Sequence, residues 1–361
     1  MKNERLKSLD AFRGFTIAAM ILVNFPGSWS HIYSPLKHAE WHGLTPTDLI
    51  FPFFLFVVGT SIALAYTKRV QQGANKKSMV KRIVWRTIKI FLVGIALNYI
   101  HHFNLNELRI AGVLQRISVV FLVCSLLFIY SRWQIQVWVA SALLVVYWIT
   151  MVFIPTPTAG GVSLEPGINM AAWIDSYLLP GKMWQETWDP EGVYSTIPAI
   201  ATGIIGMLAG KIIVTKLSNE RKIIWLFLGG TILSIAGYLW SLNFPINKNI
   251  WTSSYVLLTA GFASILLAAS YFIVDVLKRD KIARIGVVFG ANAITVYVLA
   301  DVLAFIFYTM PAGGNSLNIH FVDLFMAFSP KLGSLLYALI YVGINYAFAY
   351  FLYKRKIFIK L

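Results

Sequence analysis

The sequence predicts an all-α, polytopic membrane protein with about ten transmembrane helices and both termini in the cytoplasm. Hydrophobic residues fill 58% of its 361 positions and charged residues only 13%, whereas charged residues make up about a quarter of an ordinary soluble domain. A spanning helix needs roughly 20 mostly apolar residues, because the helix itself must satisfy every backbone polar group within the lipid. Such segments recur along the whole chain, so residues 1–361 are interpreted as one integral-membrane domain.

Ten apolar segments of this kind follow one another along the chain. The polar loop from about Phe25 to Thr45 separates the first from the second, and the longest polar connection, about 155–191, separates the fifth from the sixth. Short polar or basic connections separate the others. The predicted spans lie near residues 11–25, 46–66, 83–100, 110–130, 133–154, 192–214, 222–242, 251–275, 285–308 and 332–353.

The basic residues alternate between the predicted loops, which argues against nucleic acid as a partner despite the net charge of +16. With a cytoplasmic N-terminus, the inner segments hold 22 of the 31 Lys and Arg residues and the outer loops hold five. This is the positive-inside pattern of proteins embedded in a lipid bilayer. All six histidines then fall in outer loops, so the polar working surface is predicted to face outward.

The first predicted span carries three polar residues on one face. Arg13 and Asn24 are eleven residues apart, which at about 100° per residue places them within about 20° of each other, and Asp10 lies on the same side. Such a line could border a passage through the membrane. The alternative is an Asp10–Arg13 ion pair at the inner interface, with an Asn24 that helps to end the helix.

The fourth predicted span buries a charge. Gln115 and Arg116 lie about two turns inside its outer boundary, where a charged side chain costs at least roughly 2.5 kcal/mol. Arg116 is therefore expected to face a cavity or a partner. A salt bridge that joins two spans is the structural alternative.

Three interpretations suit the histidines of the first polar loop. His38 and His42 have the spacing of a zinc pair on a helix, but Gly43 and Pro46 disfavour a long helix, so no metal is predicted. The histidines can also be solvated side chains at the membrane interface, which suits His31 and His42. The third interpretation is general base catalysis by a neutral imidazole. The pattern alone leaves the choice open.

Six blocks of sequence carry a resemblance to a known family. They follow in order over nearly the whole chain and read RLKSLDAFRGFTIAAMILVN, LKHAEWHGLTPTDLIFPFFLFVVGTSIAL, RIAGVLQRIS, WDPEGVYSTIPAIATGIIGMLAGKI, NFPINKNIWTSSYVLLTAGFASILL and GANAITVYVLADV. The most specific block is KHAEWHG followed by TDLIFPFFLFVVG. Together they make the chain similar to the membrane-bound heparan-alpha-glucosaminide N-acetyltransferases and their bacterial relatives.

The resemblance implies an integral-membrane acyltransferase. In the family, cytosolic acetyl-CoA donates its acetyl group to the amine of a glucosamine on the other side of the membrane. The active-site histidine of the family matches His38, which would act as the general base, and the catalytic-site asparagine matches Asn24. Asn24 would orient the imidazole or donate a hydrogen bond to the oxyanion. Direct transfer in a ternary complex is favoured, and transfer through acetyl-His38 is the alternative.

The same resemblance suggests where the two substrates bind. The polar residues of the spans would line the route of acetyl-CoA, namely Asp10, Arg13, Gln115, Arg116 and Asn292. The outer edge would contact the amino sugar through Asp189, Glu191, Lys248 and Trp251. Two alternatives concern this edge: Asp189 could cap the sixth span with Pro190 at its first position, and Trp251 could belong to the aromatic belt.

One departure from the family narrows the expected substrate. The resemblance begins almost at the N-terminus, without the additional lumenal portion of the animal lysosomal enzymes. The expected protein is thus the bare catalytic unit, a multi-pass protein of a bacterial inner membrane that acts on a cell-envelope or scavenged amino sugar. A homodimer is expected by family analogy. The alternative functions are a membrane O-acyltransferase and a transporter or flippase of a sugar-containing substrate.

Overall fold

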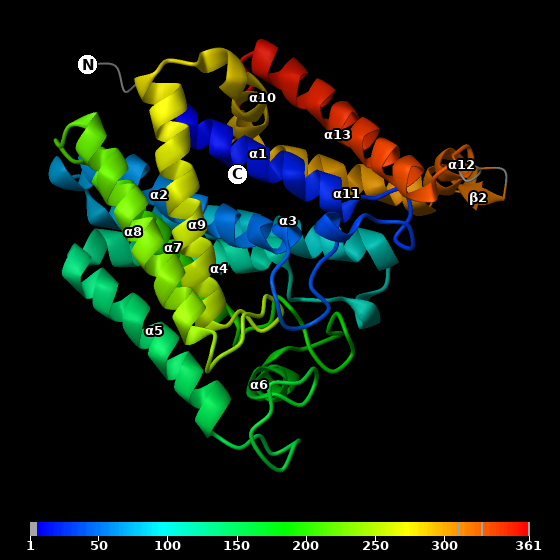
Figure 1. Ribbon diagram of the computed structural model, residues 1–361, viewed down its shortest axis with the longest axis horizontal. Coiled ribbons are helices and arrows are strands. Elements are labelled where there is room, and N and C mark those ends of the chain that lie inside the picture. The colour runs from blue at the N-terminus through cyan, green and yellow to red at the C-terminus, as the bar shows by residue number, and fades with distance from the viewer. Residues whose placement is uncertain (1–5, 310, 313, 326–327, 360–361) are drawn as a thin grey trace. The chain divides into compact units, whose positions relative to one another are not determined.

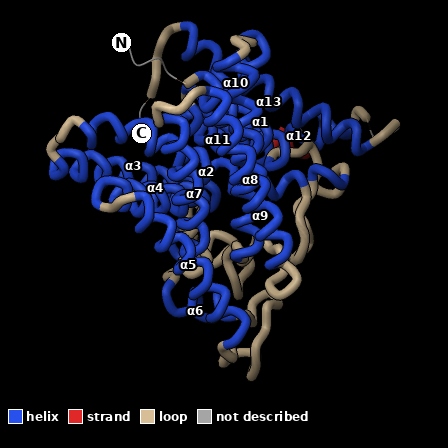
Figure 2. Tube along the Cα trace, turned by 60° about the vertical axis from the view of Figure 1, so that its left-hand side comes forward, coloured by secondary structure: helices blue, strands red, loops and turns tan. Residues whose placement is uncertain are grey.

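The computed structural model describes residues 6–309, 311–312, 314–325 and 328–359. Helices make up most of these residues (Figure 1), and the two short strands, β1 (Pro311–Ala312) and β2 (Asn315–Ser316), form an antiparallel pair. Figure 2 shows that loops occupy mainly the connections between helices. The all-α prediction is confirmed.

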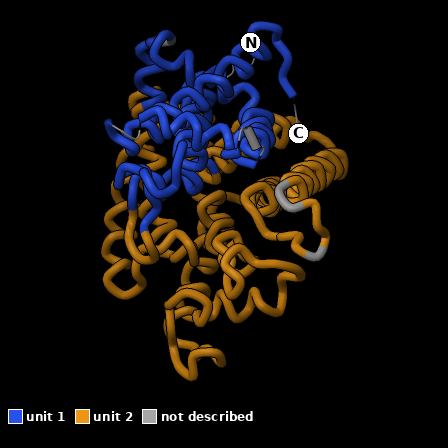
Figure 3. The backbone as a smooth tube through the Cα atoms, turned by 90° about the vertical axis from the view of Figure 1, so that its right-hand side faces the viewer, with its two compact units in different colours: residues 1–39, 45–54, 270–361 blue, residues 40–44, 55–269 orange. Residues whose placement is uncertain are grey.

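The chain divides into two compact units (Figure 3). Unit 1 comprises residues 1–39, 45–54 and 270–361, and unit 2 comprises residues 40–44 and 55–269. The first polar loop is therefore shared, because residues 25–39 belong to unit 1 and residues 40–44 to unit 2. That the two units fold as one domain stays a prediction.

Unit 1 contains both ends of the described chain. Its helix α1 is followed by the polar loop, and the remaining helices come from the last quarter of the sequence. The elements are α1 (Lys7–Asn24), the 3-10 turns η1 (Ser34–Leu36) and η2 (Pro46–Leu49), the start of α2 (Ile50–Gln71), the π-helical turn η4 (Tyr271–Val276), α10 (Asp280–Ala291), α11 (Ala293–Thr309), β1, β2, α12 (Leu317–Asp323) and α13 (Pro330–Lys354).

Glycines let α1 and α10 approach each other at backbone distance. A Cβ atom on Gly14 would lie 1.7 Å from the carbonyl oxygen of Gly286, and one on Gly290 would lie 1.9 Å from the carbonyl oxygen of Asp10. Any side chain at these positions would separate the helices. Small residues are the usual means of close helix packing within a membrane, where van der Waals contact replaces the hydrophobic effect.

The ninth predicted span, near 285–308, is not one straight helix. Helices α10 and α11 meet at Asn292 with a bend of 72°. The Asn292 amide donates to the carbonyl oxygen of Ile357 at 3.0 Å, and its carbonyl accepts from the backbone N–H of Ile359 at 2.9 Å. The bend is therefore stabilised by the C-terminal tail, whose approach the sequence of the span does not reveal.

Unit 2 is a bundle of long helices with one long loop region between α5 and α7. His101 and His102 form the last turn of α3 and do not lie in a loop, contrary to the prediction. The elements are the remainder of α2, α3 (Lys76–His102), η3 (Leu105–Glu107), α4 (Val113–Tyr130), α5 (Trp133–Phe153), α6 (Met170–Leu178), α7 (Thr196–Val214), α8 (Asn219–Trp240) and α9 (Ser253–Ser270).

Eight helices within the described ranges are long and apolar enough to cross a membrane, or up to nine if the bent pair α10–α11 counts as one span. These segments match the second to tenth predicted spans, with boundaries that differ by several residues. Helix α1, the first predicted span, is not among these apolar helices, because its 18 residues include the charged residues Lys7, Asp10 and Arg13. Hydropathy therefore located the spanning helices, while their orientation in the membrane stays a prediction.

Candidate active site

His38 faces a buried carboxylate in unit 1. Its Nδ1 atom lies 2.7 Å from Oδ1 of Asp48. The Asp48 side chain is 1% exposed, whereas the His38 side chain is 42% exposed. The pair therefore presents an accessible imidazole whose inner edge rests on a carboxylate shielded from solvent.

Protein donors hold the other oxygen of Asp48. Oδ2 accepts hydrogen bonds from the backbone N–H groups of Ala39 and Thr45, each at 3.0 Å, and shares the proton of the Thr45 hydroxyl, also at 3.0 Å, with a second acceptor. An ionised carboxylate is the form that accepts from all sides. With Asp48 ionised, Nδ1 of His38 is the protonated ring nitrogen, so Nε2 carries the basic lone pair.

The local sequence explains why Asp48 lies here. Thr45 and Asp48 form a capping box at the start of η2, with Pro46 at the first helical position. In this motif the residue three positions after the cap bonds back to the N–H group of the cap. The Thr45 hydroxyl also lies 2.7 Å from the carbonyl oxygen of Lys37, which fastens the residue before His38 to the same turn.

Asn24 is the last residue of α1 and is partly buried. Within the part of the chain that the structure describes, its side chain makes no hydrogen bond. Nearer the start of α1, Nη1 of Arg13 lies 3.3 Å from Oδ1 of Asp10 and 3.4 Å from the carbonyl oxygen of Gly290. The Arg13 side chain is 22% exposed and that of Asp10 is 6% exposed. Asp10 and Arg13 thus form an ion pair within unit 1.

A second polar cluster lies in unit 2 and joins the DPEG turn to Arg109. The guanidinium donates from Nε and Nη2 to the two oxygens of Asp189, at 2.7 and 2.5 Å, and from Nη2 to Glu191 at 2.5 Å. Burial disfavours its charge, but the bonds to Asp189 and the charge of Glu191 raise the pKa of Arg109 above its ordinary value. Sequence reasoning did not assign Arg109.

Asp189 does not cap the sixth span. Helix α7 begins at Thr196, after Ser195, so the capping alternative is wrong. The carboxylate instead accepts from the backbone N–H groups of Trp184 and Glu191, in addition to Arg109. These bonds fix the turn four residues before the helix starts.

Arg116 is almost fully buried, at 2% exposure, and its partners belong to the segment before and at the start of α7. Nη2 donates to the carbonyl oxygen of Gly192 at 3.1 Å and to the Ser195 hydroxyl, and Nε donates to the Thr196 hydroxyl at 3.2 Å. Nη1 has no hydrogen-bond partner among the described residues. The neighbouring Gln115 is also buried.

Trp251 lies below the surface of unit 2 and not in an interfacial belt. It is 1% exposed, and the guanidinium carbon of Arg116 lies 5.0 Å from the centre of its ring. Its indole N–H donates to the Thr202 hydroxyl at 3.2 Å. Its backbone is left-handed, with φ of 51°, which is unusual for a bulky residue. Lys248, at the same turn, is partly buried, and its carbonyl oxygen accepts from the Trp251 N–H.

His42 takes part in a different set of contacts from His38. Its Nδ1 lies 3.2 Å from the amide nitrogen of the buried Asn247, and the N–H of Gly43 donates to Ile246 at 2.8 Å, all within unit 2. The described residues contain no group of three or more His, Cys, Asp or Glu side chains suited to a metal ion. The expected absence of a metal stays a prediction.

Comparison with known proteins identifies the family. A family model for the catalytic part of heparan-alpha-glucosaminide N-acetyltransferase matches residues 5–237. The chain belongs to the heparan-alpha-glucosaminide N-acetyltransferase family. The heparan-alpha-glucosaminide N-acetyltransferases of Mus musculus and Homo sapiens are 32% and 31% identical to it over 421 aligned positions, which cover 99% of the chain and 60% of each relative. The chain thus spans about 60% of the length of these relatives.

Membership of the heparan-alpha-glucosaminide N-acetyltransferase family confirms the resemblance inferred from the sequence. The structure adds Asp48, a residue that sequence reasoning missed although it lies in the most specific block of the resemblance. A signal for it was present, because Thr45, Pro46 and Asp48 make a capping box directly before an apolar run. A carboxylate at the start of a membrane helix, ten residues after a histidine, is a candidate hydrogen-bond partner for that histidine.

The Arg109 cluster yields a stability prediction. Arg109→Gln leaves the carboxylates of Asp189 and Glu191, which are 0% and 11% exposed, without their counter-charge. Loss of one partner from a buried ion pair is expected to lower the free energy of unfolding by about 3–5 kcal/mol. Thermal unfolding in detergent measures the change. Lys182→Gln is the control, because the Lys182–Glu107 pair is long, at 3.9 Å, and about half exposed; equal losses from both variants would contradict the prediction.

Asp175 yields a prediction for pH. Burial raises the pKa of this carboxyl from 3.8 to about 6, although it accepts from the N–H of Tyr194 at 2.9 Å. The folded state therefore binds the proton more tightly than the unfolded chain does. The free energy of unfolding is expected to fall by up to about 3 kcal/mol as pH rises through this range, and to level off above pH 6.

The measurement compares the melting temperature of the wild type and Asp175→Asn as a function of pH. Asparagine keeps a carbonyl oxygen for Tyr194 but cannot ionise, so the variant is expected to lose this part of the pH dependence. Glu165→Gln changes an exposed carboxyl in the same long connection and is expected to keep the wild-type dependence. Parallel curves for the wild type and Asp175→Asn would refute the assignment.

Proposed function

We propose that the protein transfers an acetyl group from cytosolic acetyl-CoA to the amine of a glucosamine-type sugar on the opposite side of the membrane. The observation that carries this proposal is the contact between the accessible imidazole of His38 and the buried carboxylate of Asp48. A carboxylate behind a histidine fixes the tautomer and stabilises the imidazolium that forms when the ring takes a proton. Family membership supplies the class of reaction.

The chemistry follows from the protonation state of the acceptor. An amino sugar near neutral pH is largely an ammonium ion, and its nitrogen has no lone pair until a proton leaves. His38 takes this proton on Nε2. The nitrogen then attacks the thioester carbonyl, a C–N bond forms and the C–S bond breaks. Coenzyme A leaves as the thiolate and takes up the second proton, which the nitrogen loses as it becomes an amide; the first proton leaves His38 to solvent.

Asn24 is proposed to donate a hydrogen bond to the oxyanion of this reaction. Its amide makes no hydrogen bond to the described part of the chain, which suits a donor kept for a substrate. A well-aimed donor of this kind commonly contributes about 2.7–4 kcal/mol to stabilisation of the transition state. Asn24 and His38 both belong to unit 1.

The remaining assignments concern binding. Arg13 is partly exposed and is proposed to contact the phosphates of CoA, together with the more buried Asp10 of the same unit. Asn292 of unit 1, and Gln115 and Arg116 of unit 2, are buried and are proposed to support CoA binding, each within its own unit. At the outer edge, Glu191 and Lys248 are proposed to contact the sugar, since both are partly exposed. Asp189 and Trp251 are buried and would hold this edge in place.

Vesicles separate transfer from transport. Membrane vesicles with the cytoplasmic face inside are loaded with labelled acetyl-CoA and offered glucosamine outside. N-acetylglucosamine outside, with CoA retained inside, is the expected result. Movement of unmodified glucosamine would support a transporter, and acetylation of an N-blocked sugar at a hydroxyl would support an O-acyltransferase. Either result without N-acetylation would overturn the proposal.

The setting of this reaction is part of the proposal. The protein would be a multi-pass protein of a bacterial inner membrane, with acetyl-CoA and an amino sugar as its substrates. The spanning helices support the membrane location. A homodimer remains an expectation from the family.

A further inference from the structure

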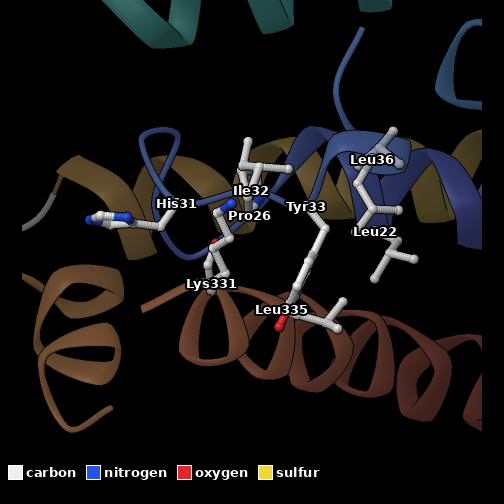
Figure 4. A pocket seen from close by; sticks show the side chains of 11 residues that line it. Leu22, Pro26, His31, Ile32, Tyr33, Leu36, Lys331 and Leu335 are labelled. Atoms are coloured by element: carbon white, nitrogen blue, oxygen red, sulfur yellow. The ribbon is translucent and has the colours of Figure 1, made fainter. Parts of the chain in front are cut away.

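The pocket between the end of α1 and the start of α13 is too small for a sugar. Figure 4 shows His31 and Lys331 toward one end of this pocket, and Leu22 and Leu36 toward the other. The pocket has room for about one water molecule. A sugar ring needs a more open surface, such as the one that the long connection of unit 2 presents around Trp184.

Trp184 carries an exposed indole ring on the long connection between α5 and α7. The residue is 62% exposed. The guanidinium carbon of Arg109 lies over the ring, 5.1 Å from its centre, and the Arg109 side chain is only 16% exposed. The cation therefore supports one face of the indole from the side of the protein. Much of the remaining ring is open to solvent.

Two further contacts fix the position of this ring. The backbone N–H of Trp184 donates to Oδ2 of Asp189 at 3.0 Å, and the same carboxylate binds Arg109. Just before Trp184, Gly181 pairs with Arg109 in an isolated β-bridge. The backbone and the ring of Trp184 thus rest on one buried ion pair. A ring that is held before the ligand arrives lowers the entropy cost of binding.

The charged groups around Trp184 are mainly acidic. Lys182 lies 3.9 Å from Glu107, and Arg109 is shared by two carboxylates. Among the described residues, this Trp184 surface comprises the indole, two cations and four carboxylates, namely Trp184, Arg109, Lys182, Glu107, Glu186, Asp189 and Glu191. The excess of negative charge disfavours an acidic ligand.

We propose that the Trp184 surface binds a non-acidic pyranose ring of the acceptor, in a sugar unit beyond the glucosamine whose amine reacts. One face of a pyranose carries mainly C–H groups and stacks on an indole. The hydroxyl groups at its edge can then bond to the surrounding carboxylates, and such a combination of an aromatic ring with a few polar groups is typical of ligand sites. The acceptor is thus an oligosaccharide without acidic sugars. This inference rests on the proposed function and names the class of its acceptor.

The chain links the Trp184 surface to the loop of His38. Trp188, four residues after Trp184, packs edge to face on Trp41 within unit 2, with ring centroids 5.0 Å apart. Trp41 follows His38 by three residues, a length of chain that reaches at most about 11 Å. Along this route an aromatic pair separates Trp184 from His38. The position of Trp184 therefore suits a sugar unit other than the one that reacts.

The first test compares acceptors with the protein in lipid nanodiscs and acetyl-CoA as the donor. The acceptors are glucosamine, glucosamine joined to one, two or three glucose units, and the same oligosaccharides with glucuronate in place of each glucose. The best acceptor of the glucose series is expected to exceed glucosamine in kcat/KM by about tenfold, the effect of burying on the order of 50 Å² of apolar surface. The glucuronate series is expected to lose most of this advantage.

Substitution of Trp184 assigns the advantage to the ring. Trp184→Ala keeps the backbone N–H that binds Asp189. It is expected to lower the ratio of kcat/KM for the best glucose-containing acceptor to that for glucosamine from about tenfold to less than about twofold. Trp184→Phe keeps a smaller ring and is expected to keep part of this ratio. Tyr177→Ala is the matched control, because it removes another exposed aromatic ring, at 76% exposure, from the same connection. It is expected to keep the wild-type ratio.

A binding measurement gives a readout that does not depend on turnover. Protein labelled with fluorotryptophan gives a fluorine resonance for each tryptophan, and the resonance that Trp184→Phe removes is that of Trp184. A glucose trisaccharide without an amine is expected to shift this resonance in a saturable way. The glucuronate trisaccharide at the same concentration is expected to leave it nearly unchanged.

The outcomes separate the inference from the function on which it rests. Equal kcat/KM values for all acceptors, a wild-type ratio in Trp184→Ala, or a Trp184 resonance that no glycan shifts would each overturn the sugar site and leave the acetyltransferase intact. The ring would then be part of the aromatic belt at the membrane interface. A preference for the glucuronate series would overturn the assignment to a non-acidic sugar. If the resonance shifts but no amine is acetylated, the proposed function fails and the sugar site stands. If Trp184→Ala does not fold, the resonance still decides.

Discussion

Replacement of Asp48 by asparagine is expected to lower kcat by about 10³-fold or more while the protein stays folded. Oδ2 of Asp48 accepts from the N–H groups of Ala39 and Thr45, and it shares the proton of the Thr45 hydroxyl with the carbonyl oxygen of Lys37. The carbonyl oxygen of an asparagine would take this position, because an NH₂ group cannot accept from them. The NH₂ group would then face Nδ1 of His38.

This arrangement reverses the roles of the two ring nitrogens. Nδ1 becomes the acceptor and Nε2 carries the proton, so the ring can no longer receive a proton from the substrate amine. Steady-state kinetics measures the effect as a lower kcat with little change in KM for acetyl-CoA. Thr45→Val removes the shared hydroxyl donor but keeps the carboxylate and its two backbone donors, and is expected to have a much smaller effect. Wild-type kcat in Asp48→Asn would exclude an orienting role for Asp48.

Replacement of His38 by alanine is expected to abolish turnover and to leave CoA binding unchanged. General base catalysis typically contributes about 10²–10⁴-fold, and alanine offers no group to receive the proton. Activity with glucosamine and binding of CoA by calorimetry are the two measurements. His42→Ala is the matched control, because this exposed imidazole contacts Asn247 and not Asp48. It is expected to retain most of its turnover.

The wild type with labelled acetyl-CoA and no acceptor distinguishes the two chemical routes. A labelled histidine adduct that forms and is then consumed by glucosamine indicates transfer through acetyl-His38. Absence of label on the protein, with rapid transfer once both substrates are present, indicates the ternary complex. Wild-type turnover in His38→Ala would remove the site assignment under either route.

The sequence predicted the helical fold well because lipid imposes a minimum length and a composition on each span. Nine of the ten predicted segments match helices, or a bent helix pair, that are long and apolar enough to cross a membrane. The exception, α1, is a helix with three charged residues in its 18 positions. The bend at Asn292 was not predicted, because it depends on backbone groups 65 and 67 residues further along the chain.

The site was predicted less completely, since hydropathy does not reveal which polar groups meet. The pairing of Arg109 with Asp189 joins residues 80 positions apart, with α4, α5 and α6 between them. The sequence around either residue contains no pattern that predicts its contact with the other. Asp48 was missed for a different reason, because its place at the head of an apolar run made it part of a span and not of the loop.

The side chain of Asp48 has both a structural and a catalytic role. One oxygen completes the first turn leading into α2, and the other supports the ring of His38. A survey of all substitutions at this position should therefore show joint loss of expression and turnover for small or apolar residues. Asparagine alone should separate the two roles: Asp48→Asn should accumulate in the membrane at normal levels and yet show almost no turnover.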